Sequence, residues 1–116
     1  MALVVEDEAL VRMYACEILE ERGFNVLQAA TAERALKVME AAPDVRLLFT
    51  DIQMPGAFDG MDLARQVHAR WPKVLVITSG QKTPSRAEIP DDSRFVAKPY
   101  RAEELISEVN DLLRKS

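Results

Sequence analysis

The chain has 116 residues, 48% of them apolar, a length that supports one domain with a hydrophobic core and is too short for two. Its 15 basic and 19 acidic side chains give a net charge of -4, and the basic residues are scattered, which argues against nucleic acid as a main partner. No apolar run is long enough to span a bilayer, and no signal segment follows Met1, so we expect a soluble, cytoplasmic protein with one domain over residues 1–116.

The first half of the chain alternates between strand-like and helix-like patterns. An apolar run at residues 2–5 predicts a strand, and a stripe of helical spacing over residues 10–19 predicts a helix that Gly23 closes. A second strand is predicted at residues 25–29. Thr31 is a good N-cap for the next helix, which ends before the following proline.

The second half continues this alternation. Strands are predicted at residues 47–50, 74–78 and 95–97, with a helical stripe at residues 63–67 and another at residues 105–113. Alternating strands and helices predict right-handed crossovers and therefore an α/β fold, a parallel sheet with helices on both faces.

One connection departs from the pattern. A fourth helix is expected between the last two strands, but Pro84 and Pro90 leave only residues 85–89 between them. Because proline interrupts a helix, the sequence predicts a short or irregular fourth helix.

Polar side chains follow the predicted strands at their carboxyl ends, the edge where open parallel sheets bind ligands. Glu6 and Asp7 follow the first strand and Asp51 the third, while Thr78 ends the fourth and Lys98 follows the fifth. If the first and third strands are neighbours, three carboxylates converge. Their mutual repulsion calls for a cation or a raised pKa, and oxygen ligands of this kind suit Mg²⁺.

The same residues fit phosphoryl transfer. Asp51 is the candidate nucleophile, because a carboxylate can attack a phosphoryl donor. The metal and Lys98 would neutralise the charge that develops on the transferring group, and the Thr78 hydroxyl would donate a hydrogen bond to it.

Five motifs, in this order and at this spacing, give the chain a family resemblance. They are residues 3–7 (LVVED), 49–55 (FTDIQMP), 59–60 (DG), 76–80 (VITSG) and 95–100 (FVAKPY). The chain resembles the receiver domain of response regulators in two-component signalling systems. The resemblance implies a flavodoxin-like doubly wound sheet with strand order 2-1-3-4-5.

The resemblance also implies how such a domain works. A partner histidine kinase or phosphotransfer protein would phosphorylate Asp51, the phosphoryl group would be lost by self-catalysis, and a downstream protein would recognise the changed surface. The resemblance further implies a switch through Thr78 and Phe95 and a cis peptide at Lys98–Pro99. The implied ligands of Mg²⁺ are Glu6, Asp7, Asp51 and the backbone carbonyl of Gln53.

Several positions differ from the commonest family pattern. Glu6 stands where many members have a second aspartate, Phe95 where tyrosine is frequent, and the loop at residues 55–59 is one residue longer. Gln53 and Gly80 match the family positions that tune the lifetime of the phosphoryl group.

Other functions were weighed against this one. An aspartyl phosphatase would place a second aspartate where Gln53 stands, and a flavin module would meet repulsion between its phosphate and Glu6 and Asp7. A receiver that binds partners without switching is the remaining alternative. Outside the site, we expect Cys16 to be a buried or half-buried thiol and Tyr100 to be partly exposed.

Overall fold

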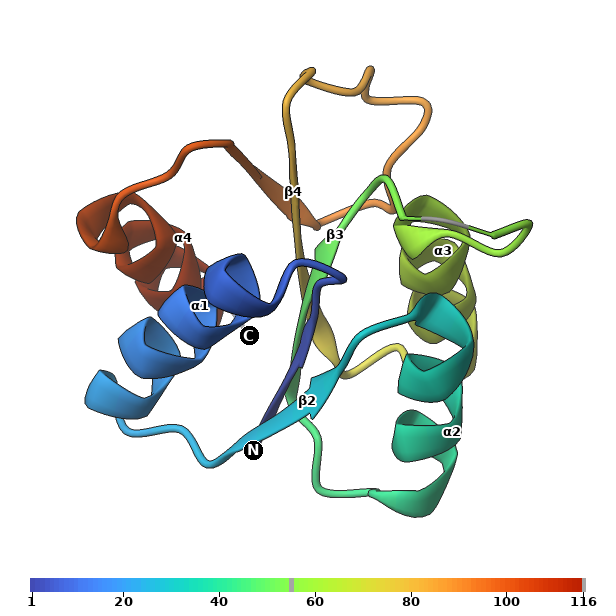
Figure 1. Ribbon diagram of the computed structural model, residues 1–116, viewed down its shortest axis with the longest axis horizontal. Helices are drawn as coiled ribbons and strands as arrows, with labels where there is room; N and C mark the ends of the chain where they lie inside the picture. The colour runs from blue at the N-terminus through green and yellow to red at the C-terminus, as the bar shows by residue number, and fades with distance from the viewer. Residues whose placement is uncertain (55, 116) are drawn as a thin grey trace.

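The computed structural model describes residues 1–54 and 56–115, which form five strands and four helices (Figure 1). Two residues lie outside the described ones: Pro55, in the second sequence motif and in the loop at residues 55–59, and Ser116, at the end of the predicted domain. In chain order the elements are β1 (Ala2–Val5), α1 (Ala9–Glu21), β2 (Val26–Ala29), α2 (Ala32–Ala41), β3 (Leu47–Asp51), α3 (Gly60–Arg70), β4 (Leu75–Gly80), β5 (Arg94–Ala97) and α4 (Ala102–Lys115).

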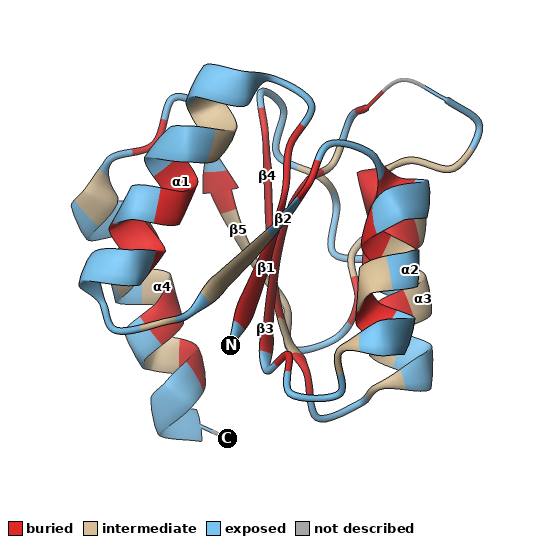
Figure 2. Cartoon of the chain, turned by 60° about the horizontal axis from the view of Figure 1, so that its bottom comes forward, coloured by how far each residue is buried: buried red, intermediate tan, exposed pale blue. Residues whose placement is uncertain are grey.

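All strand pairs are parallel and their order is β2-β1-β3-β4-β5, which confirms the predicted α/β fold and its strand order. Helices α1 and α4 cover one face of the sheet, and α2 and α3 cover the other (Figure 1). The central strands β1 and β3 are buried at every residue, as Figure 2 shows in red. Strands buried on both faces explain why the sequence shows continuous apolar runs there.

The alternation of side chains along the strands divides the core in two. Val4 and Phe49 pack in the cluster under α1 and α4, while their neighbours Leu3 and Leu48 pack in the cluster under α2 and α3. Because successive side chains of a strand point to opposite faces, a residue two positions further along a strand faces the same core.

The predicted helix ends agree with the structure. The Thr31 hydroxyl accepts a hydrogen bond from the Arg34 N–H at 3.1 Å, as an N-cap should. Gly23 follows α1 at φ +109°, where its N–H and that of Phe24 donate to carbonyls of the last turn. Helix α3 begins with a capping box between Asp59 and Asp62, which the sequence analysis did not identify.

The connection from β4 to β5 is irregular, and no helix forms among residues 81–93. The prediction of a short or irregular fourth helix is therefore confirmed in its irregular form, and α4 is the helix expected last in the chain. Within the connection, the Glu88 N–H donates to the Ser85 carbonyl at 3.0 Å, and the Ser85 N–H donates back to the Glu88 carboxylate. A single turn thus stands where a helix was expected.

Two single-residue expectations have opposite outcomes. Cys16, on the buried face of α1, is buried, in agreement with the prediction. Tyr100 was expected to be partly exposed, which is wrong: its ring packs edge-on to Phe49 and stacks with Tyr14, leaving the residue 6% exposed. None of the described helices has both the length and the apolar character needed to cross a membrane.

Candidate functional site

Glu6, Asp51 and Lys98 meet at the carboxyl edge of the sheet because of the strand period. Each lies two residues after a member of the core cluster under α1 and α4, so each continues the same face of the sheet beyond the end of that core. The three preceding core residues are Val4, Phe49 and Val96. The strand order places β1 beside β3 and brings the loop after β5 to the same edge.

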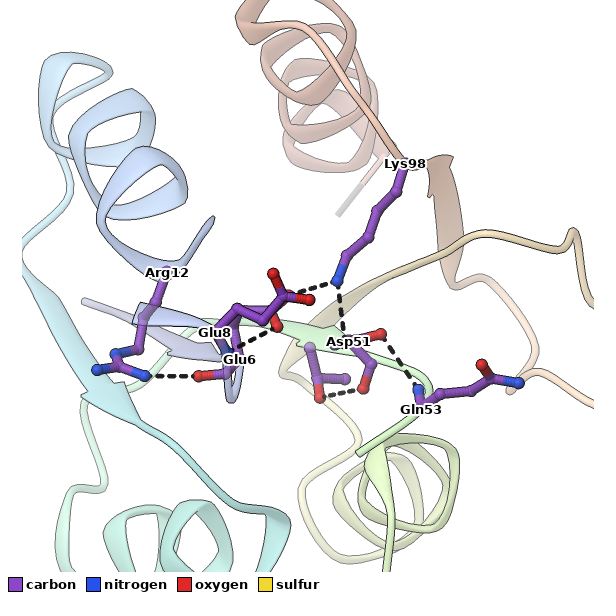
Figure 3. A network of polar contacts seen from close by, with 7 residues as sticks. Glu6, Glu8, Arg12, Asp51, Gln53 and Lys98 are labelled. Carbon is purple, nitrogen blue, oxygen red and sulfur yellow. Dashed lines mark hydrogen bonds and ion pairs between the residues drawn. The ribbon is translucent and has the colours of Figure 1, made fainter. Parts of the chain in front are cut away.

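Lys98 bridges the two carboxylates (Figure 3). Its Nζ lies 2.6 Å from Glu6 Oε1 and 3.0 Å from Asp51 Oδ2. The three side chains are largely buried, with exposed fractions of 13% for Lys98, 5% for Glu6 and 8% for Asp51. An ammonium group between two buried carboxylates offsets their repulsion, and this explains how two acids can be accommodated so close together.

Burial and pairing act in opposite directions on the ionisation of these groups. Burial raises the pKa of Glu6 above its usual value, although the hydrogen bond from Lys98 acts against this rise. For Lys98, burial alone would lower the pKa, but the hydrogen bonds to Glu6 and Asp51 outweigh it and raise the pKa above the usual value. The lysine is therefore held in its charged form.

Asp7 completes a group of three carboxylates. One oxygen each from Glu6, Asp7 and Asp51 lie within 4.8 Å of one another. Asp7 is exposed, whereas the other two are buried, so this oxygen cluster opens to solvent on one side. Three carboxylate oxygens at this spacing fit a hard divalent cation such as Mg²⁺, which binds few protein carboxylates and retains water ligands.

The backbone after β3 shapes the surroundings of Asp51. The Gln53 N–H donates to Asp51 Oδ1 at 3.1 Å, which fixes the carboxylate, and the Gln53 side chain is exposed (Figure 3). The predicted ligand atom, the Gln53 carbonyl, therefore belongs to the turn that directly follows Asp51.

Gly60 contributes to the site in a way that the sequence analysis missed. A Cβ at this position would lie 1.5 Å from the Asp51 carbonyl oxygen, a distance that no side chain can occupy. Helix α3 therefore begins in direct contact with the backbone of Asp51. The sequence shows Gly60 as part of a motif, but only the tertiary structure shows which backbone it approaches.

Thr78 and Phe95 lie side by side on adjacent strands, where they are register partners of β4 and β5. The Thr78 hydroxyl donates to the Arg94 carbonyl at 3.3 Å instead of to the Asp51 carboxylate. Thr78 follows Val76, which belongs to the core under α2 and α3, so the strand period assigns Thr78 to the face opposite Asp51. Phe95 is half-buried. The structure thus brings the two predicted switch residues together, but apart from the cluster around Lys98.

The Lys98–Pro99 peptide is cis, as the family resemblance implied. Tyr100 follows directly, and its burial together with the nearby carboxylate of Glu6 raises the pKa of its phenol well above the usual value.

Comparison with known proteins assigns the chain to a family. The family described as the response regulator receiver domain matches residues 2–110, so the chain belongs to it. Receiver domains are signalling domains that interact with histidine kinases or phosphotransfer proteins.

Curated relatives include both regulators and a kinase. The chain is 36% identical over 121 residues to the two-component response regulator PhoP of Pseudomonas aeruginosa, covering 98% of this chain and 52% of that protein. It is 33% identical over 118 residues to the sensor kinase CckA of Brucella abortus, covering 97% of this chain but 12% of the relative. The chain thus spans about half the length of the first relative and 12% of the second. For the response regulator receiver protein CpdR of Brucella abortus, at 29% identity, the match covers 96% and 94% of the two chains.

Solved structures agree with this assignment. The receiver domain of NtrX from Brucella abortus superposes with a TM-score of 0.88 at 29% identity, with both chains covered completely. A receiver domain protein from Clostridium thermocellum gives a TM-score of 0.86 at 24% identity, with 98% of this chain and 94% of that one covered, which supports the shared fold.

Proposed function

We propose that residues 1–116 form one receiver domain that accepts a phosphoryl group on Asp51, changes its surface for a protein partner, and removes the group by its own chemistry. The observation that carries this proposal is the convergence of Lys98 with the Glu6 and Asp51 carboxylates in one buried group. A buried carboxylate beside a fixed ammonium group and further oxygen ligands is suited to receive a phosphoryl group, because its transfer is catalysed mainly by positioning and charge neutralisation.

In the proposed transfer, one Asp51 carboxylate oxygen attacks the phosphorus atom of the donor. The bond between phosphorus and the donor atom breaks, and its electron pair stays with the donor, which is the imidazole nitrogen of a phosphohistidine. The Gln53 N–H, bonded to Asp51 Oδ1, holds the carboxylate in a fixed orientation during the attack. Lys98 Nζ neutralises charge on the transferring oxygens.

Mg²⁺ held by Glu6, Asp7, Asp51 and the Gln53 carbonyl would supply Lewis-acid stabilisation of the phosphoryl oxygens. In the dephosphorylation step, water attacks the phosphorus atom and the bond to Asp51 breaks, which releases inorganic phosphate and restores the carboxylate. Gln53, two residues after Asp51, and Gly80, the last residue of β4, would set the rate of this hydrolysis.

Thr78 and Phe95 would transmit the phosphorylated state. The Thr78 hydroxyl, bonded to the Arg94 carbonyl at 3.3 Å, lies on the face of the sheet opposite Asp51 and cannot turn to a phosphoryl oxygen there. The β4 hydroxyl on the Asp51 face is that of the buried Ser79, the register partner of Asp51. A bond from Ser79 to the phosphoryl group would therefore shift β4, and with it Thr78 and its register partner Phe95 on β5. We propose that Phe95 then changes rotamer and alters the surface formed by β5 and the connection before it.

The test of the phosphoacceptor uses acetyl phosphate as donor in the presence of Mg²⁺. Intact-protein mass spectrometry should show the addition of one phosphoryl group to the wild-type protein and none to Asp51→Asn. Asp44→Asn is the matched control, because Asp44 is an exposed aspartate before β3 and should not affect labelling. Undiminished labelling of Asp51→Asn would refute the assignment.

A second measurement separates a switch from a receiver that only binds partners. Beryllofluoride with Mg²⁺, a mimic of the phosphoryl group, should perturb backbone amides at β5 and at residues 81–93 as well as at Asp51. Changes restricted to the immediate neighbours of Asp51 would favour the partner-binding receiver without a switch.

A further inference from the structure

Arg12 connects the first turns of α1 to the candidate metal site. Its Nη1 donates to the backbone carbonyl of Glu6 at 2.7 Å (Figure 3). Its Nε donates to the Gln28 side-chain oxygen at 3.2 Å. The guanidinium group of Arg12 thus links α1 to the carboxyl ends of β1 and β2. Among the described residues, Arg12 forms no hydrogen bond or ion pair with a carboxylate of the site.

The contact with Arg12 completes the hydrogen bonding of Glu6. The Glu6 N–H donates to the Ala29 carbonyl at 3.1 Å, Oε1 accepts from Lys98, and Oε2 accepts from the Glu8 N–H at 3.2 Å. The Glu6 carbonyl is the remaining polar group, and Arg12 is its partner. This carbonyl belongs to the peptide that leads into Asp7, so the Arg12 contact determines the direction in which the chain enters the exposed ligand.

Two possible effects of Arg12 on a divalent cation have opposite signs. As a positive charge near three carboxylates, Arg12 repels a cation, and its removal would strengthen Mg²⁺ binding. As a support of the Glu6–Asp7 peptide, Arg12 keeps the carboxylate oxygens of the cluster within 4.8 Å of one another, and its removal would weaken binding. The sign of the change therefore distinguishes the two effects.

We propose that Arg12 is a positioning residue for the divalent-cation site and that its support outweighs its repulsion. The guanidinium group has several N–H donors in a rigid plane, so a bond to Gln28 through Nε fixes the direction of the bond to Glu6 through Nη1. Lysine carries the same charge but a single nitrogen, and it cannot hold both acceptors in this geometry. This inference rests on the proposed function, because it concerns the cation that the proposed phosphoryl transfer requires.

Direct titration with Mg²⁺, followed by calorimetry and by the backbone amide signals of Asp7 and Glu8, tests the proposal without phosphorylation. Arg12→Gln should bind Mg²⁺ about 10-fold more weakly than the wild type, the lower limit for residues that orient metal ligands. Arg12→Lys should also bind more weakly, although its charge is unchanged. Gln28→Ala should show a smaller loss, because it removes only the support of the guanidinium group.

Arg34→Gln is the control for net charge, since Arg34 is an exposed arginine on α2. Its Mg²⁺ affinity should equal that of the wild type. Unchanged or tighter binding by Arg12→Gln overturns the proposal. If Arg12→Gln does not fold, Arg12→Lys decides, and wild-type affinity in that variant overturns the proposal as well.

A kinetic measurement separates positioning from a general loss of structure. At saturating Mg²⁺, phosphorylation of Arg12→Lys by acetyl phosphate should reach the wild-type rate, with the Mg²⁺ concentration for half-maximal rate shifted upward. A lower rate that Mg²⁺ does not restore overturns the proposal. If the wild-type protein binds Mg²⁺ and the Arg12 variants bind it equally well, this inference alone is refuted. If the wild-type protein does not bind Mg²⁺, the proposed function and the inference are refuted together.

Discussion

The carboxyl edge of β1 and β3 and the connection between β4 and β5, which leaves β4 at the same edge of the sheet, are built differently. At the edge, Glu6, Asp51 and Lys98 are buried and bonded to one another. In residues 81–93, most positions are exposed and a single turn replaces the expected helix. The residues of the proposed phosphoryl transfer thus lie where packing fixes them, while the segment before Phe95, the proposed switch residue, has few contacts to oppose a change of conformation.

The difference between these regions can be tested most strongly at Gly60. Gly60→Ala should lower the free energy of unfolding by more than about 3 kcal/mol, the upper end of the usual cost of overpacking, because its Cβ would meet the Asp51 backbone at 1.5 Å. Urea unfolding measures this loss. Gly80→Ala is the matched control, since its Cβ would find its nearest neighbours at 3.7 Å and its stability should change little. Equal effects in the two variants would contradict the close approach of α3 to Asp51.

Lys98→Met tests the charge balance of the buried group. Without Mg²⁺ at pH 7, it should lower the free energy of unfolding by about 2 to 3 kcal/mol, because two buried carboxylates lose their cation. Lys82→Met, an exposed lysine in the β4–β5 connection, should cost less than about 0.5 kcal/mol in the same urea measurement. The double variant Asp51→Asn/Lys98→Met should lose less than Lys98→Met alone. A larger loss in the double variant would show that repulsion between carboxylates is not the cause.

The alkaline limit of stability tests the burial of Tyr100. Its pKa is raised in the folded protein, so above the unfolded pKa of about 10 only the unfolded chain releases the phenol proton, and stability falls as pH rises. Tyr100→Phe removes this loss. It should match the wild type at pH 7 and exceed it by about 1 kcal/mol near pH 11 in urea unfolding. Lys98 contributes equally to the stability of both proteins. If the difference in unfolding free energy between Tyr100→Phe and the wild type is the same at both pH values, the tyrosine is excluded as the cause of the alkaline loss.

The smallest effect is expected at the connection itself. Arg65 on α3 donates through Nε to the Glu88 carbonyl at 3.0 Å, an exposed bond. Arg65→Ala should change the free energy of unfolding by less than about 0.5 kcal/mol, yet it should accelerate tryptic cleavage after Arg86 several-fold, because the turn is freed. Arg34→Ala serves as control. Cleavage at the wild-type rate would mean that the connection is held by other contacts.

The sequence by itself determined the fold class and the elements. Short apolar runs placed the five strands, and apolar stripes of helical spacing placed the four helices. Pro84 and Pro90 indicated the irregular connection. These signals can be read from the sequence because they are local: they depend on the side-chain period and on the backbone hydrogen bonding of neighbouring residues. The family motifs also identified the carboxylates and the lysine, since each directly follows a strand that the pattern had already placed.

Only the tertiary structure decided which of these residues meet. The sequence grouped Thr78 with Asp51 because both lie at strand ends, but the faces of a strand alternate, and the Thr78 hydroxyl bonds to the Arg94 carbonyl of the neighbouring strand. Tyr100 was expected to be partly exposed, yet Tyr14 and Phe49 pack against its ring. Gly60 approaches the backbone carbonyl of Asp51, and Arg12 bonds to the backbone carbonyl of Glu6 and to the Gln28 side chain on another strand. Such contacts cannot be predicted from the residue types, because backbone atoms are the same at every position and only folding decides which of them a side chain reaches.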